Sequence, residues 1–196
     1  MSRYPKGHKE KTHTKIVETA SKKFREEGFK AVGVDGVMKS LGLTSGGFLA
    51  HFKNKEELFS EALTQATLEG IENLNAGLEK IEDEWERFER VLKRYLSMSH
   101  RENTCGGCPF PALTADIPRL KSKKARRLAS KDLEKYVDML KNNLPKDLKN
   151  HQDRAWATLA LLMGSLSLSR AVADDKLAKR ILEAARKMVA PELFEK

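Results

Sequence analysis

The chain has 196 residues, and its 37 Lys and Arg against 28 Asp and Glu give a formal net charge of +9. With 40% hydrophobic and 33% charged residues, the composition is that of a globular protein, not a disordered or fibrous one. No secretory signal is visible, and the most apolar stretch, 155–169, is shorter than the roughly 20 residues of a membrane helix. We therefore expect a cytoplasmic protein with no membrane partner, whose two cysteines are thiols.

The positive charge is concentrated at the N-terminal end of the chain. Up to Lys55, twelve basic residues face five acidic ones, so this part carries +7 and the remaining 141 residues carry only +2. A basic head on a near-neutral body is typical of proteins that bind a polyanion. A charged, solvated surface without a partner is the alternative interpretation.

Apolar residues recur at helical spacing along the chain, and no strand pattern is visible. Gly28 is expected to end the first helix, with Phe29 packing back, and Asn54 is expected to cap the long fourth helix together with Glu57. The first dozen residues are expected to form a loose arm. The predicted helices cover about 13–27, 34–41, 45–51, 54–78, 85–95, a short segment between the prolines of 109–118, 122–144, 151–173 and 174–189.

These elements predict an all-α protein of about nine helices in two domains. Residues 1–54 would form a three-helix head containing a helix-turn-helix, and residues 55–196 a larger helical bundle for effector binding and dimerisation. In the turn, Gly42 permits a left-handed conformation, Leu43 anchors the turn to the core, and Thr44 would cap the recognition helix. Phe48 and Phe52 are placed as core residues.

The small residues that follow the turn let the backbone approach DNA closely, and three basic or titratable residues further on are placed to hold phosphates. The predicted contacts to double-stranded DNA are Thr44, Ser45, Gly46, Gly47, His51, Lys53 and Lys55.

The run from Gly33 to Leu58, GVDGVMKSLGLTSGGFLAHFKNKEEL, resembles the DNA-binding signature of TetR/AcrR-type repressors. The resemblance implies an all-helical homodimer with an effector pocket in the second domain. Binding of a small molecule, here unknown, would change the spacing of the two heads and release a near-palindromic operator. Two residues depart from the family pattern. Leu49 stands where a Tyr commonly touches a phosphate, and Gly33 stands where Ser or Thr often caps the second helix.

A single Cys-x-x-Cys pair, Cys105 and Cys108, lies in a Gly- and Pro-rich break between helices. It supplies only half of a zinc ligand set even with His100 as a third candidate, so no metal site is predicted. Cys108 precedes Pro109 at an expected helix start, where the helix dipole lowers a thiol pKa. The alternatives are therefore two packing cysteines, a thiol- or electrophile-sensing regulator, and, from another class, a small thiol oxidoreductase that would require a βαβ setting.

The short apolar segment 110–116 corresponds, by the resemblance, to the link between the effector pocket and the head. Aromatic residues of the second domain are candidates for the pocket lining, although each fits the core equally well. Together with the cysteines, the candidate effector or sensor residues are Cys105, Cys108, Phe110, Trp85, Phe88, Tyr95 and Tyr136, and Trp156 shares the same two interpretations.

The segment 155–172 is apolar on nearly every side, which predicts a helix buried against its own domain on one face and against a partner on the other. A homodimer through helices near 151–173 and 174–189 follows, and a central core helix of a monomer is the alternative. No catalytic motif or cofactor site rises above background, so neither catalysis nor a cofactor is predicted. The sequence thus favours a DNA-binding repressor over an oxidoreductase or a sequence-blind architectural protein.

Overall fold

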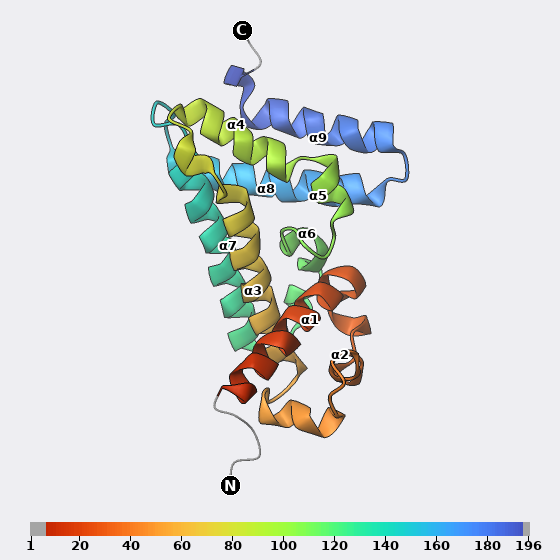
Figure 1. The fold of residues 1–196 in the computed structure, drawn as a ribbon. Helices are drawn as coiled ribbons and strands as arrows, with labels where there is room; N and C mark the ends of the chain where they lie inside the picture. Colours follow the sequence, from red (N-terminus) through yellow and green to blue (C-terminus); the bar gives the residue numbers. More distant parts are fainter. Residues whose placement is uncertain (1–6, 194–196) are drawn as a thin grey trace.

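A computed structural model describes residues 7–193, and within this range the chain is all-helical, as predicted. Figure 1 shows α1, α2 and η1 at one end, α8 and α9 at the other, and α3 beside α7 between them. None of the helices in the described range is long and apolar enough to cross a membrane. The elements are α1 (His8–Ala31), α2 (Val34–Ser40), η1 (Ser45–Ala50), α3 (Lys55–Asn75), η2 (Leu78–Lys80), α4 (Glu84–Tyr95), α5 (Met98–Glu102), α6 (Phe110–Leu113), η3 (Ile117–Arg119), α7 (Lys123–Asn143), α8 (His151–Ala171), α9 (Asp175–Val189) and η4 (Pro191–Leu193).

The first helix begins at His8, so the predicted loose arm is wrong for residues 8–12, while residues 1–6 lie outside the described range. Gly28 interrupts the helix with φ 81° and ψ 163°, a conformation that only glycine adopts readily. The break lets Phe29 turn back, and its ring lies 5.9 Å from that of Phe24 and 5.0 Å from that of Phe59. The predicted stop at Gly28 is therefore a kink followed by one short helical turn.

The long helices α3 and α7 begin at side-chain caps. Asn54 Oδ1 accepts a 2.9 Å hydrogen bond from Glu57 N, which confirms the predicted Asn54 cap. The Glu57 carboxylate accepts a 2.6 Å bond from Lys53 N, one residue before the Asn54 N–H that a capping box would use. Ser122 Oγ accepts a 3.1 Å bond from Ala125 N in the same way. These caps satisfy backbone donors that have no partner within their own helix.

One continuous hydrophobic core runs from Ile16 near the head to Ala190 beyond α9. The helix α1 packs on α3 and α6, α7 packs on α3 and α8, and α8 packs on α9. The short helix α5, which sequence periodicity did not predict, joins α4 to the Gly-rich turn before α6. The division of the chain at residue 54 stays a prediction, because the core connects both parts.

Candidate DNA interface and its link to the helical body

The turn between α2 and η1 has the geometry of a helix-turn-helix. Gly42 has φ 69°, and its N–H donates to Lys39 O at 3.0 Å, while Leu43 N donates to Met38 O at 3.0 Å. Leu43 is partly buried and packs against the core, to which Val37 and Met38 of α2 belong. The left-handed turn and its anchor are therefore as predicted, and they fix the position of η1.

The element expected to be a recognition helix is wound as a 3₁₀-helix over Ser45–Ala50. The Thr44 side chain makes no capping bond, so the predicted Thr44 cap is wrong. Instead the Thr44 carbonyl accepts a 3.0 Å bond from Gly47 N, which is the i to i+3 spacing of the tighter helix. Thr44, Ser45 and Gly46 are exposed, and so is Leu49 at 74%. Small polar groups thus lie on the surface at the end of the molecule.

The three residues predicted to hold phosphates are in different environments. Burial is the main reason why the pKa of His51 lies below its ordinary value, and the charges of His13 and Lys9 add to the effect. A neutral His51 at pH 7 offers no charge to a phosphate. Lys53 is exposed beside the start of α3.

Lys55 differs from Lys53, because its ammonium group is held within the head. It lies 4.5 Å above the Phe29 ring and donates to Lys30 O at 3.4 Å. Burial lowers its pKa below the ordinary value. A phosphate would have to draw Lys55 away from these contacts.

Most of the predicted effector residues are buried in the core of the described part of the chain. Phe88, Tyr95, Phe110 and Tyr136 are fully buried core side chains, with the Phe110 and Tyr136 rings edge to face at 6.0 Å. Trp85 lies elsewhere, half-buried, and its Nε1 donates to Asp147 Oδ2 at 3.3 Å.

An open groove of about 560 Å³ lies beside this aromatic cluster. Of the predicted residues it contains only Cys108, and polar side chains from α4 and α5 form much of its wall. Its lining residues are Gly70, Asn73, Leu74, Lys93, Arg94, Ser97, Ser99, His100, Asn103, Gly106, Gly107 and Cys108. An effector that bound in this groove would therefore not contact the predicted aromatic residues.

Cys108 is buried, with 2% of its surface exposed, whereas Cys105 is half-buried. Burial raises the pKa of the Cys108 thiol. The predicted activation of Cys108 by a helix N-terminus is therefore wrong, because α6 has only four residues and desolvation outweighs it.

His100 spans the Gly-rich turn with both ring nitrogens. Its Nδ1–H donates to Tyr95 O at 2.7 Å, and its Nε2 accepts a 3.1 Å bond from Cys108 N, so the ring is neutral. Burial accordingly lowers its pKa. Within residues 7–193 no group of three or more His, Cys, Asp and Glu side chains is arranged to hold a metal ion, and no strand provides the βαβ setting of a thiol oxidoreductase.

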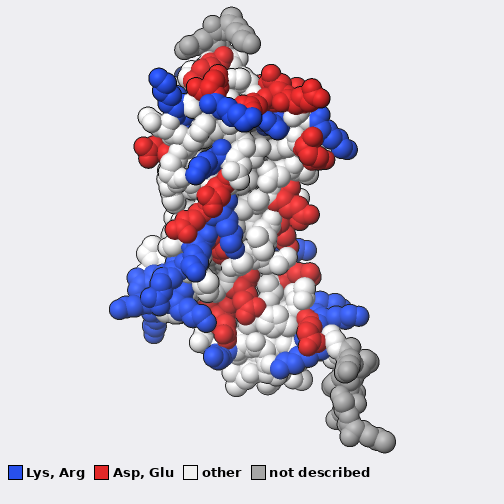
Figure 2. Space-filling model, turned by 90° about the vertical axis from the view of Figure 1, so that its left-hand side faces the viewer, with Lys and Arg blue, Asp and Glu red and all other residues white. Residues whose placement is uncertain are grey.

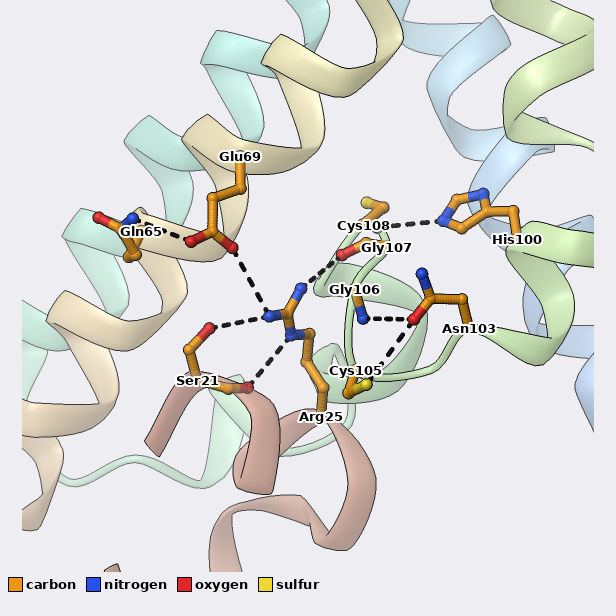
Figure 3. A network of polar contacts seen from close by, with 10 residues as sticks. All are labelled: Ser21, Arg25, Gln65, Glu69, His100, Asn103, Cys105, Gly106, Gly107 and Cys108. Carbon is orange, nitrogen blue, oxygen red and sulfur yellow. Dashed lines mark hydrogen bonds and ion pairs between the residues drawn. The ribbon is translucent and has the colours of Figure 1, made fainter. Parts of the chain in front are cut away.

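A buried arginine joins the head to the Gly-rich turn (Figure 3). Arg25 on α1 donates from Nη1 to Gly107 O at 2.9 Å and from Nε and Nη2 to Ser21 O and Oγ, both at 3.1 Å. Its Nη2 also lies 3.8 Å from Glu69 Oε2 on α3. Burial lowers the pKa of Arg25, and the Glu69 carboxylate opposes that shift. The guanidinium therefore connects three segments that are far apart in the sequence.

A second link lies one turn further along α1. Phe29 N donates to Asp116 Oδ2 at 2.9 Å, so a carboxylate of the α6–η3 segment holds the chain just after the Gly28 kink. Sequence analysis did not identify Arg25 or Asp116. The one available signal was that Arg25 directly follows buried Phe24 and lies one helical turn after Ser21, on the face that packs against the body.

A helix-turn-helix with an exposed second element, on a larger helical body, defines the class of helix-turn-helix regulators. Residues 16–62 match the family model of bacterial regulatory proteins, tetR family. This N-terminal part of the chain is therefore similar to the DNA-binding domain of the TetR/AcrR-type family.

Curated relatives match over the same end of the chain. The transposon Tn10 TetC protein of Escherichia coli is 29% identical over 85 residues, 43% of this chain and 43% of that protein. The probable acrEF/envCD operon repressor of Escherichia coli K12 is 33% identical over 82 residues, 40% of this chain and 37% of that protein. The matched part thus spans less than half the length of these relatives.

Solved structures match over nearly the whole chain at lower identity. The reduced form of E. coli NemR aligns with a TM-score of 0.76 and 19% identity, over 92% of this chain and 96% of that one. A TetR transcriptional regulator from Chloroflexus aurantiacus aligns with a TM-score of 0.76 and 20% identity, over 95% and 96%. These matches confirm the fold of the body as well as the head.

Proposed function

We propose that this protein is a homodimeric, ligand-responsive transcriptional repressor that binds a near-palindromic operator. The observation that carries the proposal is the exposed Thr44–Gly46 surface, held at the end of the molecule by the Gly42 turn and a buried core. Its small side chains suit close approach to a major groove. The name of one relative, an operon repressor, points in the same direction.

Exposed apolar residues on α8 and α9 support the dimer. Among the described residues, five of the seven large exposed hydrophobic side chains lie on these two helices: Trp156, Leu161, Leu168, Leu177 and Met188. Gly164 lies on the same exposed side of α8 and leaves room for a close neighbour. An apolar surface of this kind on a small protein favours a partner helix pair over water.

The links between the groove and the head support a ligand response. Gly107 lines the groove, and its carbonyl accepts the hydrogen bond from Arg25 of the head. A molecule that moved the Gly-rich turn would change this bond, and thereby the position of α1. A ligand shifts a conformational equilibrium only when it binds one state more tightly than the other. Here the two states would differ in the position of the Gly-rich turn.

The proposal is tested by selecting bound duplexes from a random DNA library with the purified full-length protein. We expect enrichment of a near-palindrome whose half-sites are separated by about one helical turn, roughly 34 Å, or a multiple of it. Enrichment of no motif from a protein that is folded and dimeric would contradict it. Uniform retention of all sequences would favour the architectural alternative.

A further inference from the structure

A dense group of basic residues lies outside the head, at the start of α7. Seven basic and no acidic residues lie in the segment from Arg119 to Lys131. Since residues 56–196 carry a net charge of only +2, the residues of that part outside this segment carry −5. All seven side chains are exposed, and Figure 2 shows Lys and Arg gathered on this flank of the molecule. This basic cluster comprises Arg119, Lys121, Lys123, Lys124, Arg126, Arg127 and Lys131.

The basic cluster is not neutralised within the chain. Among the residues that the structure describes, no carboxylate lies within ion-pair distance of its seven side chains. The next acidic residue, Asp132, is buried and accepts hydrogen bonds from Thr64 Oγ1 at 2.7 Å and Lys135 Nζ at 2.8 Å. The charge of the cluster is therefore open to an external partner.

This arrangement is unfavourable for the helix itself. The first turn of α7 contains no acidic residue, although the positive end of the helix dipole favours one. Lys123 and Arg127, four residues apart, are like charges on neighbouring positions and destabilise the helix further. A local cost of this kind is expected where a surface serves a function.

Contacts with α3 place the basic cluster at the head end of the molecule. Glu56 accepts hydrogen bonds from Lys121 N and Ser122 N, both at 2.8 Å, and so fixes the start of α7 against the first turn of α3. Lys124 lines the same groove of about 440 Å³ as Lys53, the exposed lysine of the predicted DNA interface.

Two other carboxylates in this groove are already engaged within the chain. Glu57 accepts a 2.6 Å hydrogen bond from Lys53 N, and Glu61 pairs with His13 at 2.6 Å. The positive surface of the basic cluster therefore adjoins the head at Lys53.

We propose that the basic cluster binds phosphates of the duplex that flanks the site contacted by the head. The inference rests on the proposed DNA-binding function, because it assumes that the head places the duplex at this end. DNA continues as a charged rod beyond each half-site, and exposed Lys and Arg bind its phosphates without regard to sequence. The footprint would then be longer than the sequence motif.

The test compares a selected motif as a minimal duplex with the same motif extended by about ten base pairs, one helical turn, on each side. Affinities for the wild type, K123Q/K124Q/R127Q and K80Q/K141Q/K149Q are measured by fluorescence anisotropy at several salt concentrations. The control variant loses the same charge from exposed lysines of η2, α7 and the α7–α8 loop, away from the start of α7.

For the wild type and the control we expect roughly tenfold tighter binding of the extended duplex and a steeper salt dependence. The cluster variant should lose this gain, with the salt slope lowered by about one for each phosphate contact removed. Equal gains in all three proteins would overturn the inference while leaving the proposed function intact. Wild-type protein that binds neither duplex would instead refute the proposed function. Binding to anionic lipid vesicles is measured in parallel. A cluster variant that lost vesicle binding but kept the gain on the extended duplex would also overturn the inference.

Discussion

Arg25 of the head donates a 2.9 Å hydrogen bond to the carbonyl oxygen of Gly107, 82 residues further along the chain. The donor is a buried guanidinium, and the acceptor belongs to the Gly-rich turn that carries Cys105 and Cys108. A movement of the Gly-rich turn therefore acts on α1 through the Arg25 side chain alone.

Replacing Arg25 with Met removes the guanidinium while keeping an apolar stem of similar length. We expect the free energy of unfolding in urea to fall by about 1–3 kcal/mol, because the buried Gly107 carbonyl loses its donor. K22M, an exposed substitution on the same helix, is the control and should change stability little. Equal free energies of unfolding for R25M and wild type would show that the hydrogen bond from Arg25 to Gly107 does not contribute to stability.

The two cysteines should react with iodoacetamide at different rates. The thiolate is the reacting form, so burial and the raised pKa of Cys108 should make it slow, whereas half-buried Cys105 should be modified first. Peptide mass spectrometry over time in native buffer and in urea measures this difference. A Cys108 that reacted as fast as Cys105 in the native state would restore the thiol-sensing alternative.

His100 should make stability depend on pH. Its folded-state pKa is lowered by burial, so the unfolded chain binds the proton more tightly, and acidification below the ordinary histidine value of about 6.5 destabilises the fold. H100Q keeps a donor and an acceptor but does not titrate in this range. The stability advantage of wild type over H100Q should therefore be largest above pH 7 and shrink toward pH 5. A difference that is independent of pH would contradict this assignment.

Leu168, 61% exposed on α8, should be essential to the dimer. A glutamate there places a charge in the proposed apolar interface, so light scattering should report a mass near the 22.1 kDa monomer for L168E. L68E changes a leucine that is 49% exposed on α3 and should remain dimeric. An L168E variant that remained dimeric would show that the dimer interface does not include this surface.

Local signals in the sequence predicted much of this structure. The Gly28 interruption, the Asn54 cap and the Gly42 turn each depend on residues within a few positions of one another, so their spacing was sufficient. The hydrogen bond from Arg25 joins distant segments and leaves no periodic pattern. The 3₁₀ winding of η1 was also missed, because i to i+3 and i to i+4 spacing are hard to separate over six residues.

The predicted helix 122–144 is visibly basic, but counting charge by domain concealed how strongly its start is charged. The near-neutral total after Lys55 is the sum of a strongly positive segment, 119–131, and a negative remainder. Averaging over a whole domain hid the segment, whereas a short sliding window would have found it. Of the two interpretations that the sequence left open for the aromatic candidates, Phe88 and Tyr95 fit the core, and helical spacing could not decide because pocket residues on the same helices would share it.

The surface at Ser45 is proposed to bind a specific duplex. The decisive experiment titrates wild type, S45E and N142E against a selected duplex and its scrambled version, since both substitutions change an exposed residue to Glu and Asn142 lies on α7, away from the head and from the proposed dimer surface. Wild type and N142E should prefer the selected duplex by a factor on the order of a thousand or more. S45E should lose that preference, because its carboxylate faces the DNA. Full discrimination by S45E, or none by the wild type, would show that the Ser45 surface does not bind a specific duplex.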